Sequence, residues 1–311
     1  MPGKDESRMK IVDIGSLNVD YVYRVDDFVK PGETKSSKDR NVYAGGKGLN
    51  QSIAVARAGG KICHAGIIGS DGDILKEALD NAGVDTHYLQ KKDVAGGHTF
   101  IQVSDAGQNS ILLYGGTNQM LTEEYIDSVL SDCDKGDIIL LQNETNLVGY
   151  TIEKAYELGL RVALNASPMD ENLMHCPLGK VSWLVVNEIE GSTLAGSTEE
   201  EEEIVKAVAE KYPDCALVLT LGSRGVRYHD KTQDEHMNAY KIKNVVDTTA
   251  AGDTFLGYFL ACTAEGMPVR DILLRSTTAS AMAIQVKGAS DSIPARSEVE
   301  KAIAEKRFGE L

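Results

Sequence analysis

Hydrophobic residues along this chain follow two alternating patterns. Short apolar runs rich in Val, Ile and Leu are typical of strands buried on both faces of a sheet. Longer runs in which apolar residues recur every three to four positions, several of them followed by glycine, are typical of amphipathic helices. We predict strands at residues 10–15, 62–68, 137–142, 161–165, 183–187 and 216–221. We predict helices at residues 48–58, 73–82, 122–130, 148–158, 200–212, 251–265, 269–286 and 297–306.

This alternation predicts an α/β fold with a doubly wound, mainly parallel central sheet flanked by helices. No segment of 20–50 residues repeats, and we treat residues 10–306 as a single domain. Residues 20–43 and 98–114 do not follow this alternation of buried strands and helices. Their pattern is typical of short strands with alternating apolar and polar residues, which predicts a small added β-sheet. Because such a sheet has exposed edges and one face to bury, we expect it to be a lid over a cleft, a clasp between two copies, or both. Two surface hairpins without a function are the alternative.

The composition narrows the class of protein. Among 311 residues, 47 Asp and Glu outnumber 32 Lys and Arg, and no basic cluster is present, which argues against binding to nucleic acid or an anionic membrane surface. The longest apolar run, at 255–264, is too short to cross a bilayer, and residues 1–8 lack the apolar stretch of a signal peptide. Five scattered cysteines without a CxxC pair indicate neither disulfides nor a zinc site. We expect a cytoplasmic protein.

A glycine-rich segment, Ala44-Gly45-Gly46-Lys47-Gly48, comes directly before a predicted helix. Its glycines allow the backbone, and its lysine a positive charge, to approach a ligand closely. The segment is not a P-loop, because Gly48 follows the lysine where Ser or Thr would hold magnesium, and it lacks the third glycine of a dinucleotide fingerprint. A purely structural turn into the helix is the alternative.

A second segment, residues 247–255, leads from a strand end into the helix at 251–265. Free N–H groups at Ala251, Gly252 and Asp253 would converge there and form a hole for an anion such as a transferring phosphoryl group. Asp253 could take the proton of an attacking hydroxyl, since that proton is lost late in a loose phosphoryl-transfer transition state. Alternatively, this carboxylate only complements the helix dipole.

Glycines, hydroxyls and polar side chains also follow the predicted strands. The segment 219–225 carries glycines and hydroxyls suited to nucleotide phosphates at the end of a buried strand, where α/β folds bind ligands. Polar side chains after the other strands are Asn18, Asp20, Glu144, Asn187 and Glu190. Each of them could be a helix cap or a turn residue. Together they would suit a hydroxyl-rich ligand and a metal-bound phosphate at one edge of the sheet.

Six segments, in this order and spacing, resemble the ribokinase-like carbohydrate kinases, and the resemblance runs from about residue 10 to residue 303. The segments are Gly15-Ser16-Leu17-Asn18-Val19-Asp20, Pro31-Gly32-Glu33-Thr34, Gly45-Gly46-Lys47-Gly48-Leu49-Asn50, Asn187-Glu188-Ile189-Glu190, Thr220-Leu221-Gly222-Ser223-Arg224-Gly225 and 247–255. The resemblance implies an ATP-dependent sugar kinase with about nine core strands and a β lid that often joins two copies into a homodimer.

The resemblance also implies residue roles. Asp253 would be the general base, and the anion hole would be formed by Ala250, Ala251 and Gly252. Mg²⁺ would accompany ATP, and a monovalent cation, usually K⁺, would bind beside the anion hole. The sugar would contact Asn18, Asp20, Gly46, Lys47, Asn50, Glu144 and Asp253. The nucleotide and its metal-bound phosphates would contact Asn187, Glu190, Thr220, Gly222, Ser223, Gly225, Gly252 and Thr277. The monovalent cation would contact Asp247, Thr249, Ala283, Val286, Gly288 and Ser292, several of them through backbone carbonyls.

Two segments depart from the pattern of these kinases. Asn165-Ala166-Ser167-Pro168 replaces the more usual Asn-Pro-Ala-Pro, and Thr277 stands where His or Asn often borders the adenine. The expected reaction is transfer of the γ-phosphate of ATP to O5 of D-ribose, which gives ribose 5-phosphate. Another sugar or a nucleoside is the alternative substrate, and a non-catalytic sensor of sugar or nucleotide is the alternative from another class.

Overall fold

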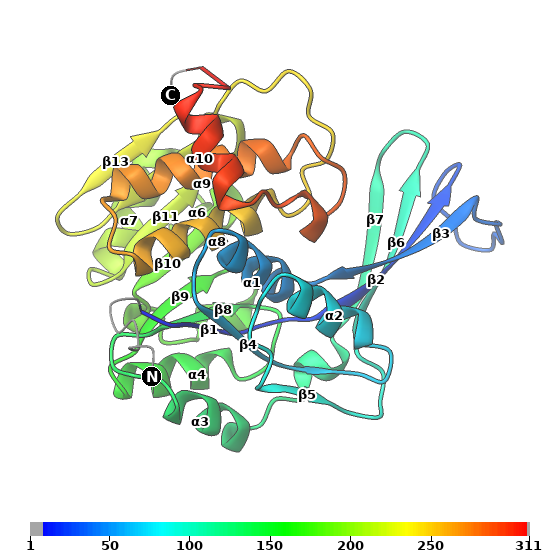
Figure 1. Ribbon diagram of the computed structural model, residues 1–311, viewed down its shortest axis with the longest axis horizontal. Coiled ribbons are helices and arrows are strands. Elements are labelled where there is room, and N and C mark those ends of the chain that lie inside the picture. The colour runs from blue at the N-terminus through cyan, green and yellow to red at the C-terminus, as the bar shows by residue number, and fades with distance from the viewer. Residues whose placement is uncertain (1–8, 310–311) are drawn as a thin grey trace.

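The computed structural model describes residues 9–309, and within them nine strands form one sheet in the order β13-β12-β11-β10-β9-β8-β1-β4-β5 (Figure 1). From β11 to β5 all neighbours are parallel, whereas β12 and β13 add an antiparallel edge. The strands are β1 (Ile11–Ile14), β4 (Ile62–Ile68), β5 (Leu89–Lys91), β8 (Ile138–Gln142), β9 (Arg161–Asn165), β10 (Trp183–Asn187), β11 (Ala216–Thr220), β12 (Val226–His229) and β13 (Asp234–Met237). This architecture confirms the predicted fold class.

Helices cover both faces of this sheet, because successive residues of its strands point to opposite sides. On β1, Ile11 packs into one apolar core and Val12 into the other. The α-helices are α1 (Lys47–Arg57), α2 (Asp73–Asn81), α3 (Glu123–Ser131), α4 (Val148–Glu157), α5 (Glu171–Met174), α6 (Glu188–Leu194), α7 (Glu201–Lys211), α8 (Ala251–Ala264), α9 (Val269–Ala283) and α10 (Arg296–Ala304). Short 3₁₀ turns are η1 (Gly116–Gln119), η2 (Leu178–Lys180), η3 (Gly222–Arg224) and η4 (Ser290–Ser292).

The predicted small sheet is present as a separate four-stranded sheet that projects from the helix-covered body (Figure 1). Its strands lie in the order β3-β2-β6-β7, with β2 parallel to β6 and the two outer pairs antiparallel. They are β2 (Asn18–Val25), β3 (Asp39–Gly45), β6 (Gly97–Ser104) and β7 (Asn109–Tyr114). Both ends of this order are unpaired edges among the described residues.

All fourteen elements predicted from the periodicity are present, and their ends differ by three residues at most. The largest difference is at α9, predicted to reach Val286. The helix ends at Ala283, where the chain turns and the Val286 N–H donates to the Ala283 carbonyl. Five short strands and α-helices were not predicted, namely β5, β12, β13, α5 and α6, nor were the four 3₁₀ turns.

Close packing of α1 against α8 is the feature of the fold that positions the candidate site. Ten of the fourteen residues of α8 are buried. At Gly257 of α8, an added Cβ would lie 2.2 Å from the Cβ of Ala54 on α1. Because only glycine permits this approach, the start of α8 lies directly beside the first turns of α1.

Two further expectations concern targeting and redox state. Residues 1–8, on which the prediction about a signal peptide rests, lie outside the described residues. Among residues 9–309, no helix combines the length and the apolar composition needed to span a membrane. All five cysteines are free thiols.

Candidate active site

The start of α8 presents a carboxylate to the first turns of α1. The Asp253 carboxylate accepts hydrogen bonds from Asn50 Nδ2 at 3.1 Å and from Gln51 Nε2 at 2.8 Å. Burial raises the pKa of Asp253, while the Gln51 donor, the Lys47 charge and the Asn50 donor oppose this effect. The carboxylate is therefore directed into the molecule and held by two amide donors.

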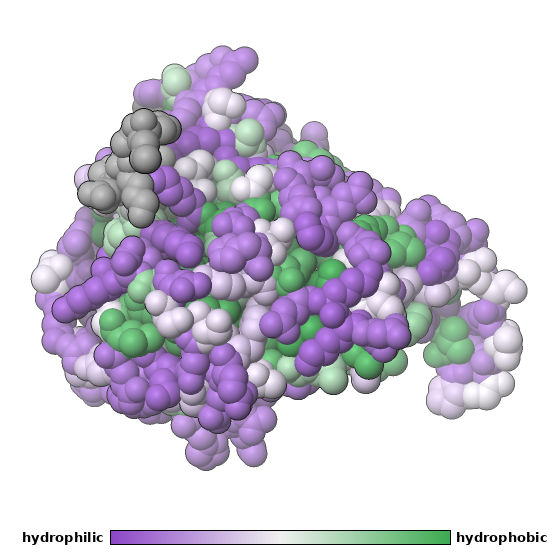
Figure 2. Space-filling model, turned by 60° about the horizontal axis from the view of Figure 1, so that its bottom comes forward, coloured by the Kyte–Doolittle hydropathy of each residue, from purple (hydrophilic) through white to green (hydrophobic). Residues whose placement is uncertain are grey.

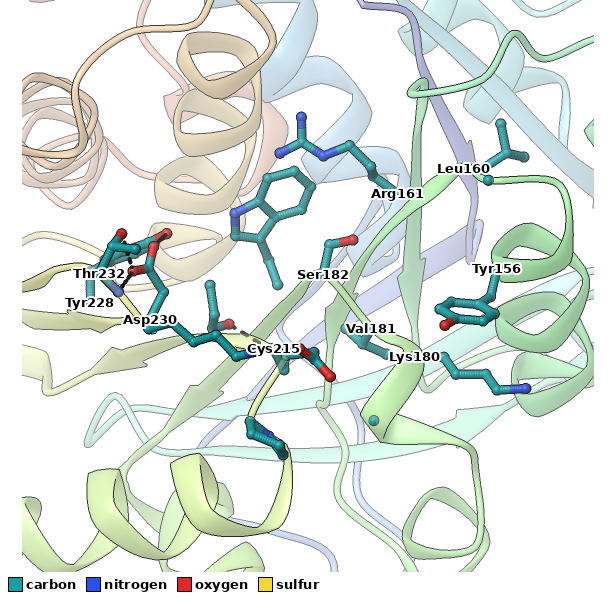
Figure 3. A pocket seen from close by; sticks show the side chains of 17 residues that line it. Tyr156, Leu160, Arg161, Lys180, Val181, Ser182, Cys215, Tyr228, Asp230 and Thr232 are labelled. Atoms are coloured by element: carbon teal, nitrogen blue, oxygen red, sulfur yellow. Dashed lines mark hydrogen bonds and ion pairs between the residues drawn. The ribbon is translucent and has the colours of Figure 1, made fainter.

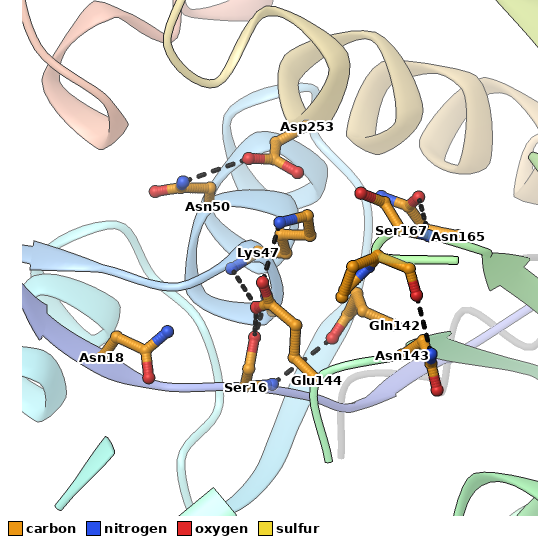
Figure 4. Close-up of polar contacts among 12 residues, drawn as sticks. Ser16, Asn18, Lys47, Asn50, Gln142, Asn143, Glu144, Asn165, Ser167 and Asp253 are labelled. Atoms are coloured by element: carbon orange, nitrogen blue, oxygen red, sulfur yellow. Dashed lines mark hydrogen bonds and ion pairs between the residues drawn. The ribbon is translucent and has the colours of Figure 1, made fainter. Parts of the chain in front are cut away.

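Lys47, at the first position of α1, forms an ion pair beside this carboxylate (Figure 4). Its Nζ lies 2.7 Å from Oε1 of Glu144, whose side chain is only 8% exposed. Ser16 Oγ donates to the same carboxylate at 2.6 Å, and the Lys47 backbone N–H donates at 3.3 Å. Burial would lower the pKa of Lys47, but the charge and hydrogen bond of Glu144 outweigh burial, so the pKa lies above its usual value. Lys47 is therefore a cation near Asp253.

The beginning of β2 supplies two more of the predicted sugar contacts. Asn18 is buried, and its Oδ1 accepts from Asn118 Nδ2 at 2.8 Å. Asp20 accepts from Thr99 Oγ1 at 2.5 Å, and burial raises its pKa to about 6. Figure 4 shows the side chain of Asn18 directed toward the same space as Lys47 and Asn50.

One buried atom of this site, Asn50 Oδ1, retains hydrogen-bonding capacity for a ligand. Asn50 Oδ1 is buried and accepts no hydrogen bond from any residue in 9–309. A hydroxyl donor of a ligand would satisfy it. Gly46 caps α1 with a φ of 97°, a backbone conformation that glycine adopts readily. The structure thus brings together all the predicted sugar contacts, namely Asn18, Asp20, Gly46, Lys47, Asn50, Glu144 and Asp253.

A cavity of about 680 Å³ opens on the other side of the start of α8. Seven of the eight predicted nucleotide contacts line it, as does Ala251 of the predicted anion hole. Apolar walls from Tyr240, Ile242, Val245, Phe255 and Ile284 complete the cavity, and the sequence pattern did not indicate them. The predicted residues that line it are Asn187, Thr220, Gly222, Ser223, Gly225, Gly252 and Thr277. The Thr277 Oγ1 is buried without a hydrogen-bond partner in the described part of the chain.

Glu190, the eighth predicted nucleotide contact, does not line this cavity. Its Oε2 accepts the backbone N–H of Asn187, and Asn187 Oδ1 accepts the backbone N–H of Glu190, both at 2.9 Å. This reciprocal pair is a capping box at the start of α6. The charge of Glu190 also raises the pKa of Lys47, so the residue still lies near the site.

The predicted anion hole differs in one respect from the sequence-based expectation. The N–H of Ala251 is not free, because it donates to the Thr248 carbonyl at 3.3 Å. This bond forms because Ala250, the N-cap, adopts a left-handed conformation (φ 57°, ψ 12°) that turns the chain tightly into the helix. The N–H groups of Gly252 and Asp253 have no acceptor among residues 9–309 and remain available for an anion.

The residues predicted to hold a monovalent cation lie on the loop before α8, at the end of α9 and on the loop after α9, and the Asp247 carboxylate joins the two loops. The carboxylate accepts from the Thr249 N–H at 2.9 Å and from the Gly288 N–H at 3.1 Å. Val246 and Asp247 donate their N–H groups to Ile284, near Ala283 and Val286. Ser292 Oγ instead donates to the Ala289 carbonyl at 2.8 Å. The structure therefore places the loop before α8 against the loop after α9, beside the anion hole.

A second cavity lies at the opposite ends of the parallel strands of the large sheet, where these strands begin (Figure 3). It is lined by Arg161, Trp183 and Ala216, the first residues of β9, β10 and β11. The Arg161 guanidinium packs 4.1 Å from the centre of the Trp183 ring. None of the predicted site residues lines this second cavity, whereas Asn187 and Thr220 end the same strands at the candidate site.

Sequence reasoning missed Gln51, Gln142 and Ser16 as members of the site. Gln51 contacts Asp253, Gln142 contacts Gln51, and Ser16 contacts Glu144. Gln51 directly follows the segment that ends at Asn50, Ser16 lies within the segment 15–20, and Gln142 ends a predicted strand, so position alone could have indicated them. The side that a helical residue faces depends on packing against another helix, which the sequence pattern alone does not specify.

Comparison with known proteins gives relatives that match most of this chain. Residues 8–296 match the model of the pfkB family of carbohydrate kinases. A ribokinase of Haemophilus influenzae is 33% identical over 94% of this chain and 97% of its own length, and a deoxyribokinase of Salmonella typhi is 31% identical over 92% and 96%. The solved structure of Arabidopsis thaliana ribokinase complexed with ribose and ATP superposes with a TM-score of 0.84 at 30% identity, over 94% of this chain and 98% of that one.

Proposed function

Because this chain belongs to the pfkB family of carbohydrate kinases, we propose that it transfers the γ-phosphate of ATP to O5 of D-ribose. One observation carries the proposal. Gly252 lines the nucleotide-sized cavity, and the next residue, Asp253, contacts Asn50 in the pocket of polar side chains. The start of α8 therefore lies between a site for a nucleotide and a site for a hydroxyl-rich ligand, which is where a phosphoryl group would have to pass.

In the proposed reaction, Asp253 accepts the proton of the ribose 5-hydroxyl as O5 attacks the γ-phosphorus. The O5–phosphorus bond forms, the bond from the γ-phosphorus to the bridging oxygen breaks, and ADP leaves with that oxygen. The N–H groups of Gly252 and Asp253 stabilise the charge on the transferred group, and Lys47 adds a positive charge beside it. Burial that raises the pKa of Asp253 makes it a stronger base when it is ionised.

Sugar binding in this proposal uses the polar pocket of α1, β2 and Glu144. Asn50 Oδ1 accepts a sugar hydroxyl that would satisfy this buried atom, and Asp20 and Asn18 bind hydroxyls from the β2 side. The small sheet acts as a lid over the bound sugar and excludes water that would otherwise hydrolyse ATP.

Carboxylate and amide oxygens at the start of α6 suit the magnesium ion that accompanies ATP, because hard cations prefer oxygen ligands. Asn187 and Glu190 would orient the metal-bound phosphates, and Mg²⁺ would neutralise charge on the transferring group.

A panel of acceptors tests the proposed function. Purified protein with MgATP is assayed for ADP formation with D-ribose, 2-deoxyribose, fructose and adenosine. We expect D-ribose to give the highest kcat/KM. The similarity to a deoxyribokinase makes 2-deoxyribose the sharpest competitor, because the two sugars differ by one hydroxyl. If another acceptor gave a higher kcat/KM, that acceptor and not ribose would be the substrate. Absence of ADP formation with every acceptor would contradict a catalytic function.

We expect a monovalent cation at the loops joined by Asp247 to support turnover. A fixed cation there would hold the loop before α8 in place and so direct the Gly252 and Asp253 N–H groups at the phosphoryl group. Replacing K⁺ by tetramethylammonium at constant ionic strength is expected to lower kcat severalfold. Equal rates in the two salts would exclude this role.

We expect the small sheet to join two copies into a homodimer. Its edge strand β7 exposes apolar side chains, including Ile111 (57%) and Leu112 (70%), and Figure 2 shows apolar residues on the projecting part of the molecule. An unpaired apolar edge of this kind favours pairing with another chain. Sedimentation at micromolar concentration should give a dimer for the wild type and a monomer for Leu112→Asp. Leu158→Asp, at an exposed apolar residue after α4, is the matched control and should stay dimeric.

A further inference from the structure

Two buried glutamines lie in a line behind the Asp253 carboxylate. Gln51 on α1 donates from Nε2 to Asp253 Oδ1 at 2.8 Å, and its Oε1 accepts from Gln142 Nε2 at 2.9 Å. Both glutamine side chains belong to residues that are 0% exposed. Gln142 ends β8 and has no hydrogen bond to Asp253, so its hydrogen-bonded route to the carboxylate runs through Gln51.

The hydrogen bonds of Gln142 define which way its amide faces. Its Nε2 donates to Gln51 and also to Asp13 Oδ1 at 3.0 Å, while its Oε1 accepts the backbone N–H of Ser16 at 3.3 Å. Turning the amide over would place its oxygen against two other oxygens and its NH₂ against the Ser16 N–H. The contacts with the Gln51 oxygen and the Ser16 N–H are repulsive, as is the contact with Asp13 when its Oδ1 carries no proton, and buried groups without partners are costly.

The orientation of Gln142 in turn fixes that of Gln51. The NH₂ of Gln142 requires an acceptor, so Gln51 places Oε1 toward it and Nε2 toward Asp253. A reversed Gln51 would bring its Oε1 against the Asp253 carboxylate. We propose that Gln51 and Gln142 are positioning residues that hold the Asp253 carboxylate ionised and directed at the acceptor hydroxyl. This proposal rests on the proposed function, in which Asp253 is the general base.

The charged groups around Asp253 explain why a neutral donor matters there. Lys47 of α1 favours the ionised carboxylate, whereas Glu144 after β8 and Asp13 of β1 disfavour it when they are charged. Burial also favours the protonated form. Lys47 is itself paired with Glu144. The hydrogen bond from Gln51, the charge of Lys47 and the hydrogen bond from Asn50 therefore together oppose burial and favour the ionised base.

The test compares Gln51→Met and Gln142→Met, which keep the side-chain size but remove the amides. Measured are kcat and sugar KM from pH 5 to 9. For Gln51→Met we expect the acid limb of kcat to move up by roughly one to two pH units, the effect of one hydrogen bond to an ionised group. Sugar KM should change less than kcat. Gln142→Met should shift the same limb in the same direction by a smaller amount, although this residue does not contact Asp253.

One control separates positioning from a general loss of packing. Thr151→Val removes one buried side-chain hydrogen bond in α4, a helix that contributes none of the site residues, and should leave the acid limb unchanged. If Gln51→Met does not fold, Gln142→Met decides the outcome. A wild-type acid limb in the folded glutamine variants would overturn the proposal.

The Asp253→Asn background distinguishes failure of this proposal from failure of the proposed function. If Asp253→Asn keeps wild-type turnover, Asp253 is not the base, and both proposals are wrong. If Asp253→Asn loses turnover but the glutamine variants keep the wild-type acid limb, only the positioning proposal is wrong. In the expected case, adding Gln51→Met to Asp253→Asn has no further effect on the pH dependence of the residual rate.

Discussion

Asp253→Asn should lower kcat by about 10²–10⁴-fold, the contribution of a positioned general base. The substitution keeps the shape of the side chain, and one oxygen remains to accept from Gln51. The new NH₂ group would face Asn50, whose Oδ1 has no other partner among the described residues and can turn to accept from it. The loss therefore falls mainly on proton transfer. Asn50 would then present Nδ2 in place of Oδ1 to a sugar hydroxyl, which can accept as well as donate, so sugar affinity should change much less than kcat.

Steady-state rates together with calorimetric titration of ribose would measure these two effects separately. Asp271→Asn is a matched control, because Asp271 also lies in the first turn of its helix, α9, but is exposed to solvent. If Asp253 only complemented the dipole of α8, both substitutions would have the same small effect. Turnover of Asp253→Asn close to wild type would remove the assignment of the base.

The long strands and helices of the fold could be predicted from the sequence, but the short strands at one edge of the large sheet could not. Strands buried on both faces, such as β4 and β8, are continuous apolar runs whose type is clear from the residues alone. The antiparallel edge strands β12 and β13 are four residues each. Apolar and polar residues alternate in β12, but over too few residues to predict a strand, and β13 has a single apolar residue, Met237. Helix α6 is seven residues long and includes a glycine, which weakens its helical signal.

For the candidate site, residues at strand ends could be predicted, because the carboxyl ends of parallel strands meet at one edge of a sheet. Asn187 and Thr220 are examples, and both line the nucleotide-sized cavity. The roles of the individual site residues came from the resemblance to ribokinase-like carbohydrate kinases. The comparisons confirm that the chain belongs to that family. The residue roles stay predictions. Gln51 and Asp13 could not be found in this way. Their contacts depend on how α1 packs against α8 and β1, which is a property of the whole fold.

Asp13 is unusual because it is a carboxyl group on a central strand, with no exposed surface. Burial raises its pKa to about 8, although hydrogen bonds from Gln142 and Ser52 oppose the change, and the charge of Asp253 adds to it. Ser52 Oγ lies 2.8 Å from Asp13 Oδ2 and 2.8 Å from His64 Nδ1. Burial lowers the pKa of His64 to about 4. Burial thus favours the neutral form of both groups in the native protein, although His64 Nδ1 lies 3.6 Å from Asp13 Oδ2.

Asp13→Asn should consequently stabilise the protein, increasingly so as the pH rises. Between the unfolded pKa of 3.8 and the native pKa of about 8, the native state holds a proton on Asp13 that the unfolded state has released, so wild-type stability falls across this range. Asparagine removes this dependence, and the gain in the free energy of unfolding at pH 7 should reach at most about 4 kcal/mol. His64 has the opposite dependence between about pH 4 and 6.5, but it is present in both proteins.

Urea unfolding of both proteins at pH 4.5, 6, 7 and 8 would measure this difference. Asp230→Asn is a control in which the free energy of unfolding should change in the opposite direction. Burial would raise the pKa of Asp230, but donors from Tyr228 and Thr232 outweigh burial and lower it. Its carboxylate thus stabilises the native state above pH 3.8, and Asp230→Asn should destabilise by a nearly constant amount at all four pH values. A pH-independent loss of stability in Asp13→Asn as well would mean that Asp13 is ionised in the native protein. Gln142 would then donate to a charged partner, and its orientation would be held more strongly than a neutral Asp13 allows.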